Sequence, residues 1–433
     1  MFSRDQILGS RRPGFVFSIF LLLVALAPSP VYPYRDWTEI TLPYVPTVES
    51  VSAHVLDHET GDVLFSHNAD EVIAPASMTK LVTMHILLEE VRAGRLAFDE
   101  LINIPPQAYS QNAPPRSSLM FLGPRQQATV HDLLLGLAVT SGNDAAVAAA
   151  LLIEPSVELF VERMNREMDE LGLENTRFVE PSGYSPFNRT TAREFAAFAR
   201  YYVERHPETT REFHNVRSFS YPRPENLIAG NHEHAIFQNN TNRLLWLMPE
   251  ADGLKTGTIT SSGFNLAATA ARNGRRVVAV VMSVRAQRNA NELRALIARD
   301  LLEYGLSGFI QVEPATPDLA PVRVAGGAEI HVNPSIDGWR NGEGLLVPSA
   351  YASDISVHVE VVDSVRAPVP ERAILGHVVI TSGETELYRF IVRPEHDVPD
   401  GPWWRRLWDA IAIRIAAVFS GEEIPPRATD LVA

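Results

Sequence analysis

The feature that most constrains the fold is a pair of strand-like apolar runs that flank Asn273-Gly274. Asn-Gly favours a tight two-residue hairpin turn because both residues tolerate positive φ angles, so the runs at residues 264–271 and 276–283 predict a β-hairpin. A second pair of alternating runs lies near residues 51–65, with a turn that ends at Gly61. The apolar faces of both hairpins must be covered by other elements.

The chain between the two hairpins has helical periodicity. Apolar residues recur at helical spacing in residues 75–94, and residues 129–151 and 156–172 follow the same pattern. The order is therefore a strand pair, helices, a second strand pair and a further helix. This order predicts the α+β class, with helices and a sheet packed as an α/β sandwich.

The character of the chain changes near Gly308. From residue 309 to residue 400 helical periodicity disappears, proline and glycine become more frequent, and short alternating runs follow one another. This pattern is typical of a small all-β domain. We therefore predict a main domain at residues 48–308 and a β-rich C-terminal domain at residues 309–400.

The N-terminal residues 1–27 have the pattern of a secretory signal peptide. Arg11-Arg12 precedes an apolar run that closes with the small-x-small sequence Ala25-Leu26-Ala27. The run is shorter than the ~20 residues that a spanning helix needs. Pro28 is unfavourable just after the cleavage point, so an uncleaved anchor stays open as the alternative. Residues 28–47 would form an N-terminal extension.

The C-terminal residues 401–421 predict an amphipathic helix. On a helical wheel of residues 403–419 a set of large apolar residues falls within about 120°, namely Trp404, Leu407, Trp408, Ile411, Ile415, Val418 and Phe419. Arg405, Arg406 and Asp409 occupy the far side. A length of about 26 Å and the arginines argue against a spanning helix. We expect the helix to lie on the inner-membrane surface. The alternative is a helix that docks on its own protein.

Charge and cysteine content exclude several classes of function. The chain has 38 Lys plus Arg against 52 Asp plus Glu, a net charge of −14, and no cysteine. An acidic chain without a basic domain is a poor partner for nucleic acid, and the lack of cysteine excludes disulfides, thiolate metal sites and cysteine nucleophiles. Only two of the 38 basic residues are lysines, Lys80 and Lys255. Both are candidates for positions that arginine cannot fill.

Ser77 and Lys80 stand three positions apart where a helix begins, so their side chains share a face. A lysine of lowered pKa can take the proton of a serine nucleophile, whereas arginine cannot. Alone the pair is a weak signal, because a helix cap and a solvated lysine give the same sequence. Two further elements follow in order, Ser141-Gly142-Asn143 and Lys255-Thr256-Gly257. The three together are the signature of penicillin-binding proteins and serine β-lactamases.

On these motifs the chain resembles the serine-type D-alanyl-D-alanine carboxypeptidases, the low-molecular-mass penicillin-binding proteins of the peptidase S11 type. Residues 75–81, 141–146 and 252–257 are similar to the family's motif segments, and the likeness extends over roughly residues 48–308. Residues 367–376 and the terminal helix resemble the family's β-rich domain and membrane anchor. The resemblance implies a penicillin-binding-protein/β-lactamase-like sandwich, a small all-β C-terminal domain and a terminal amphipathic helix.

The resemblance implies acyl transfer. Ser77 would attack the carbonyl of the penultimate D-alanine with Lys80 as general base, and Ser141 would relay a proton towards the leaving amine. Backbone N–H groups of Ser77 and Thr258 would form the oxyanion hole. Asn143 has a structural alternative as a helix cap. The implied substrate-binding residues are Asn143, Lys255, Thr256, Gly257, Thr258 and Arg285.

Two histidines offer a competing metal site. His232 and His234 would share one face of a strand. Spacing supplies no third ligand, so an exposed polar segment is the preferred interpretation. We expect no metal and no cofactor.

These observations predict a carboxypeptidase that removes the terminal D-alanine from peptidoglycan stem pentapeptides and is inhibited covalently by β-lactams. It would be secreted across the inner membrane and attached peripherally at the periplasmic face. The runner-up is a D,D-endopeptidase that cleaves cross-bridges. A β-lactamase is disfavoured because class A enzymes deacylate through a glutamate-activated water, for which no element stands out between the second and third motifs. An inactive cell-wall scaffold is the alternative from another class.

Overall fold

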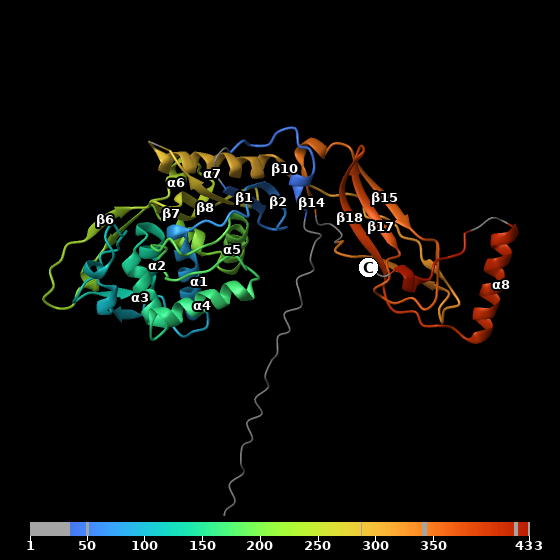
Figure 1. Ribbon diagram of the computed structural model, residues 1–433, viewed down its shortest axis with the longest axis horizontal. Helices are drawn as coiled ribbons and strands as arrows, with labels where there is room; N and C mark the ends of the chain where they lie inside the picture. Colours follow the sequence, from blue (N-terminus) through green and yellow to red (C-terminus); the bar gives the residue numbers. More distant parts are fainter. Residues whose placement is uncertain (1–34, 49–51, 287, 340–343, 420–422, 432–433) are drawn as a thin grey trace, which may run out of the picture.

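The computed structural model describes residues 35–48, 52–286, 288–339, 344–419 and 423–431. The predicted signal peptide at residues 1–27 lies outside these ranges. Figure 1 shows a larger lobe of helices and strands beside a smaller, β-rich lobe that carries helix α8 (Trp403–Phe419) at its far end.

The larger lobe is built on a five-stranded antiparallel sheet with strand order β2-β1-β9-β8-β7. Both predicted hairpins are present, and Asn273 and Gly274 have φ angles of 53° and 82° in the turn between β8 and β9. Strand β9 pairs with β1, so the two hairpins form one sheet. The strands are β1 (Ser52–Asp57), β2 (Val63–His67), β7 (Ala251–Ile259), β8 (Gly263–Arg272) and β9 (Arg275–Val284).

Helices cover both faces of this sheet because its strands bury side chains on both sides. In β9, Val278 and Val280 belong to one apolar cluster, and Val277 and Val281 belong to the other. Helix α7 (Ala290–Ser307) covers one face, and α1–α5 lie on the other (Figure 1). These are α1 (Lys80–Arg92), α2 (Val130–Leu135), α3 (Asn143–Ile153), α4 (Val157–Glu170) and α5 (Ala192–Arg205). The predicted sandwich is confirmed.

The helical character predicted for residues 129–151 is confirmed in part, because a break at Ser141 and Gly142 divides this range. Helix α2 passes into a π-helical turn at Gly136–Thr140, Ser141 adopts a left-handed φ of 57°, and only then does α3 begin. The apolar periodicity runs through the break, but the buried Asp144 carboxylate binds the backbone N–H groups of residues 120–122 at 2.8–3.0 Å. That loop passes so close that a Cβ at Gly142 would lie 2.9 Å from the Met120 nitrogen.

Short elements complete the larger lobe. They are β3 (Leu101–Asn103), β4 (Gln127–Thr129), β5 (Ser218–Tyr221), β6 (Ile236–Asn239) and α6 (Leu244–Leu247).

The smaller lobe contains strands joined in three sheets, with orders β13-β18-β17-β15, β12-β11-β16 and β10-β14. The predicted all-β character of residues 309–400 is confirmed, whereas the independent folding of the predicted domains stays a prediction. The strands are β10 (Phe309–Val312), β11 (Val322–Ala325), β12 (His331–Val332), β13 (Pro334–Ile336), β14 (Leu345–Pro348), β15 (Ile355–Val361), β16 (Ser364–Arg366), β17 (Gly376–Ser382) and β18 (Thr385–Pro394).

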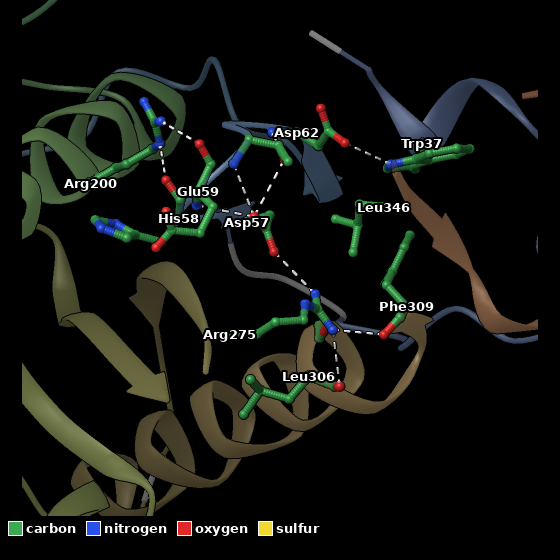
Figure 2. Close-up of polar contacts among 12 residues, drawn as sticks. Trp37, Asp57, His58, Glu59, Asp62, Arg200, Arg275, Leu306, Phe309 and Leu346 are labelled. Atoms are coloured by element: carbon green, nitrogen blue, oxygen red, sulfur yellow. Dashed lines mark hydrogen bonds and ion pairs between the residues drawn. The ribbon is translucent and has the colours of Figure 1, made fainter. Parts of the chain in front are cut away.

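The two lobes meet around Trp37 and Arg275 (Figure 2). Arg275 donates to the Asp57 carboxylate at 3.0 Å and to the carbonyl of Phe309 at 2.6 Å, which ties the start of β10 to the main sheet. Trp37 is fully buried and donates to Asp62 at 3.3 Å. The part of the N-terminal extension that contains Trp37 is therefore built into the junction between the lobes.

Candidate active site

Ser77 lies in a 3-10 turn, Ala76–Thr79, that leads directly into α1. Two glycines bring other segments against the backbone of this turn. A Cβ at Gly183 would lie 1.8 Å from the Ala76 oxygen, and a Cβ at Gly257 would lie 2.4 Å from the Pro75 oxygen. Only glycine fits at either position, so both segments can press directly on the turn that carries Ser77.

Lys80 is fully buried, and its Nζ is surrounded by three oxygen atoms. The distances are 3.1 Å to Ser77 Oγ, 2.7 Å to Asn143 Oδ1 and 2.5 Å to the carbonyl of Ser182. Burial lowers the pKa of Lys80 to about 7, against the opposing influence of the nearby Glu180 and Asp144 carboxylates. A neutral amine beside Ser77 is therefore accessible near neutral pH.

The second motif brings Asn143 and Ser141 to the same place. Besides accepting from Lys80, the Asn143 amide donates to Ser117 Oγ at 3.0 Å. Asn143 thus links the lysine to the loop that borders the site, which is more than a helix cap does. Ser141 is buried next to it in the left-handed conformation. Within the described part of the chain, its hydroxyl makes no hydrogen bond that joins it to Ser77 or Lys80.

The third motif lies on β7. Lys255 is buried, and burial lowers its pKa well below the ordinary value, with the positive charges of Lys80 and Arg294 acting in the same direction. Its Nζ donates to the carbonyl of Thr256 at 3.2 Å, and Thr256 Oγ1 shares a hydrogen bond of 2.6 Å with Thr241. The strand packs against the turn that carries Ser77 through Gly257, and it holds a buried amine and hydroxyl groups.

A pocket of about 540 Å³ opens over these residues. Ser77 and Asn143 of the first two motifs line it with Thr258, which directly follows the third motif, whereas Lys255 and Thr256 are not among the lining residues. The structure thus brings together the three motifs that are far apart in the sequence.

Arg285 lies outside this pocket. It lines a neighbouring hollow of about 570 Å³ that shares Thr258 with the pocket, and it donates to the carbonyl of Ser261 at 2.5 Å. Its role as a second carboxylate ligand stays a prediction.

Glu180 is a residue that the motifs do not reveal. Its carboxylate accepts hydrogen bonds from the backbone nitrogens of Ser182, Gly183 and Ser185 at 2.7–3.2 Å and from Asn188 Nδ2 at 3.0 Å. These bonds fix the loop whose Ser182 carbonyl accepts from Lys80. Because both carboxylate oxygens are held by backbone and side-chain donors, Glu180 is not placed as a base that activates water.

Arg294 on α7 supports the third motif from behind. It is 3% exposed and donates to the carbonyls of Gly257 and Asn265 at 2.9 and 3.1 Å and to Thr258 Oγ1 at 3.0 Å. Burial lowers the pKa of Arg294 to about 10. The only sequence signal for this role is a charged residue on the buried side of a helix, which is visible only once the packing of α7 is known.

Metal ligation finds little support among the described residues. His232 and His234 lie in an exposed segment. His85, Glu89 and His206 cluster elsewhere, between α1 and the end of α5. The two rings share a hydrogen bond of 2.9 Å and Arg205 binds both oxygens of Glu89 at 2.8 Å, whereas His85 Nε2 is buried with no hydrogen-bond partner among the described residues.

The peptidase S11 family, described as D-alanyl-D-alanine carboxypeptidase, matches residues 39–286. The chain belongs to this family. This S11 carboxypeptidase is 29% identical to the D-alanyl-D-alanine carboxypeptidase DacC of Escherichia coli strain K12, over 85% of this chain and 89% of that protein. The match to a D-alanyl-D-alanine endopeptidase of the same strain is 30% identical but covers 62% of this chain and 83% of that protein.

A solved structure gives the same result. Penicillin binding protein 5 from Haemophilus influenzae superimposes with a TM-score of 0.68 and 28% identity, over 82% of this S11 carboxypeptidase and 99% of that chain. The resemblance inferred from the motifs is therefore confirmed. The protein is a serine-type D-alanyl-D-alanine carboxypeptidase with a penicillin-binding-protein fold.

Proposed function

We propose that the enzyme removes the terminal D-alanine from peptidoglycan stem pentapeptides through an acyl-ester on Ser77. The observation that carries this proposal is the environment of Lys80 Nζ. A neutral amine has two N–H bonds and one lone pair, and the acceptors Asn143 Oδ1 and Ser182 O occupy the two N–H directions. The lone pair is then left for the Ser77 hydroxyl at 3.1 Å.

In this mechanism Lys80 takes the Ser77 proton as Oγ bonds to the penultimate D-alanine carbonyl. The C–N bond to the terminal D-alanine then breaks, and the leaving amine receives a proton relayed through Ser141. Water hydrolyses the ester and regenerates Ser77. Backbone N–H groups of Ser77 and Thr258 would stabilise the oxyanion.

Positive charge is available for the terminal carboxylate of the substrate. The Arg294 guanidinium contacts the Gly257 carbonyl and the Thr258 hydroxyl of β7, and Lys255 and Thr256 lie on the same strand. We assign carboxylate binding to this strand, with Arg285 as a further contact from the neighbouring hollow.

The same nucleophile would open β-lactams, because their strained amide presents a carbonyl to Ser77 in place of the peptide. The name of the Haemophilus relative, a penicillin binding protein, supports this expectation. The endopeptidase alternative is favoured by one relative that matches a smaller share of this chain.

The test is release of D-alanine from a pentapeptide that ends in D-Ala-D-Ala, compared with a cross-linked dimer of the same peptide. We expect faster release from the monomer and none above background with Ser77→Ala. Preferential cleavage of the cross-link would favour the endopeptidase, and unchanged release by Ser77→Ala would overturn the assignment of the nucleophile.

We further propose peripheral attachment to the periplasmic face of the inner membrane through residues 403–419. The polar side of α8 docks on the small lobe, where Arg405 donates to the carbonyl of Ala328 at 2.9 Å and Asp409 accepts from the Gly326 nitrogen at 2.7 Å. The apolar side faces away, with Trp403 and Trp408 70% and 68% exposed. This orientation supports lipid contact over docking of the apolar side on the protein.

Among the described residues, no helix has both the length and the apolar character to cross a membrane.

A further inference from the structure

A hollow of about 280 Å³ lies where the polar side of α8 meets the small lobe. Arg406 and Ile413 of the helix line one side of it. Arg366, at the end of β16, and Arg427, which follows the helix, line the other. The hollow is remote from Ser77, which lies in the larger lobe.

The acidic groups of this hollow are already engaged. Asp409 accepts from the Gly326 nitrogen at 2.7 Å and pairs with Arg323 at 3.5 Å. Asp400 pairs with Arg406 at 3.6 Å. The cations at the opposite wall therefore have no carboxylate of the hollow to neutralise them.

Arg366 and Arg427 are the unneutralised cations. Neither guanidinium has an ion pair or a hydrogen bond with another described residue, and the Nε atom of Arg366 is buried without a partner. A buried donor that lacks an acceptor costs free energy, so an acceptor oxygen at Arg366 Nε would be favourable. Arg366 and Arg427 form a parallel β-bridge, so their side chains start from neighbouring backbone positions. Two arginines that line the same hollow suit the oxygens of a phosphate group.

We propose that this hollow binds the phosphate group of an anionic phospholipid. The proposal rests on the membrane attachment proposed above. A lipid is favoured over free phosphate because α8 turns its tryptophan-bearing side outward while its opposite side lines the hollow. A helix of this kind lies at the boundary between headgroups and acyl chains, so phosphates surround it at the level of its polar side.

The test uses the full mature chain with vesicles of phosphatidylcholine, with or without phosphatidylglycerol, and sedimentation to measure binding. Each arginine near an anionic surface raises the affinity for that surface by about fivefold. We therefore expect R366Q/R427Q to bind phosphatidylglycerol vesicles at least about tenfold more weakly than wild type. The single variant Arg427→Gln alters only an exposed side chain and should lose about fivefold without a change in melting temperature. Binding to pure phosphatidylcholine should be unchanged in both variants.

The control is R372Q/R389Q, which removes the same charge from exposed positions of the small lobe. A loss as large as that of R366Q/R427Q would reduce the effect to general electrostatics and overturn the site. If wild type binds no vesicle at all, the membrane proposal itself fails. Two results together would assign the hollow to free phosphate and overturn the lipid. Millimolar inorganic phosphate would raise the wild-type melting temperature, and vesicle binding would not depend on Arg366 and Arg427.

Discussion

At the residue scale, we propose different roles for the two lysines. Lys80 touches Ser77 Oγ and has its pKa lowered by burial to about 7, so it can accept a proton near neutral pH. The role proposed for Lys255 is to supply charge to the substrate carboxylate, although burial lowers its pKa as well. A base must lose its proton, whereas a charge must keep it, and only the first requirement excludes arginine.

We therefore predict that Lys80→Arg abolishes acylation by penicillin, with a loss of about 10²–10⁴ in rate, the range for a general base. Lys255→Arg should leave a measurable remnant, because arginine also supplies a positive charge. Stopped-flow or gel measurement of acylation with a fluorescent penicillin checks both variants. Equal rates in the two variants would refute this division of roles.

The pH dependence of acylation follows from the same group. With Lys80 as the proposed base and its pKa lowered by burial to about 7, the acylation rate should rise about tenfold per pH unit below pH 7 and level off above it. The negative charge of Glu180 raises the pKa of Lys80, so Glu180→Gln should move the midpoint to lower pH while slowing the plateau rate. If Glu180→Gln slows the plateau rate of acylation but leaves the pH midpoint unchanged, the role of Glu180 is limited to holding the loop.

The sequence predicts the motif residues that the structure brings together, but it does not predict the residues that hold them in place. Ser77, Lys80, Asn143 and Lys255 could be predicted because the chemistry fixes their residue types and their order. Glu180 could not, because a carboxylate that binds backbone N–H groups of its own loop leaves no fixed spacing.

At the element scale, glycines let the loop and strand approach Ser77. Gly183 has a φ of 81°, and a Cβ there would collide with the Ala76 oxygen, whereas Gly172 has a φ of 71° and no atom within 4 Å of a Cβ. Gly183→Ala should slow acylation by about a hundredfold or more, since a displacement of about 1 Å has that effect at reacting centres.

Gly172→Ala is the matched control. It should lower the free energy of unfolding by roughly 1–2 kcal/mol through backbone strain alone and leave the acylation rate intact. Thermal unfolding and acylation are measured on both variants. If Gly183→Ala acylates at the wild-type rate, the close contact with Ala76 is not needed for catalysis.

The break between α2 and α3 shows why elements were only partly predictable. The apolar periodicity of residues 129–151 predicts helical structure but does not place the break. The interruption comes from Asp144, whose carboxylate binds a loop more than 20 residues earlier in the sequence. A hydrophobic pattern cannot reveal such a contact, whereas the β-hairpins were predictable because Asn273-Gly274 encodes its turn locally.

At the scale of the whole molecule, Asp62 joins three parts of the chain. Its carboxylate accepts from Trp37 of the N-terminal segment and from Tyr388 of β18, both at 3.3 Å. Burial is the largest influence on this carboxyl, and it raises the pKa of Asp62 to about 6. No sequence pattern predicted the junction, because each of these residues is ordinary in its own element.

This junction gives a pH-dependent stability. Between about pH 4 and pH 6 the folded protein binds a proton at Asp62 that the unfolded chain has lost, so this contribution to the free energy of unfolding declines as pH rises through that window. Asp62→Asn removes the titration. The stability of the variant relative to wild type should therefore increase by up to roughly 3 kcal/mol from pH 4 to pH 7. Denaturant unfolding at both pH values checks it, and a constant difference would contradict it.

The most direct test of the central claim is the mass of the intact protein after incubation with penicillin, followed by digestion. We predict that wild type gains the mass of one antibiotic molecule, that the adduct maps to the peptide containing Ser77, and that Ser77→Ala gains nothing. An adduct on another residue, or labelling of Ser77→Ala equal to wild type, would contradict the account.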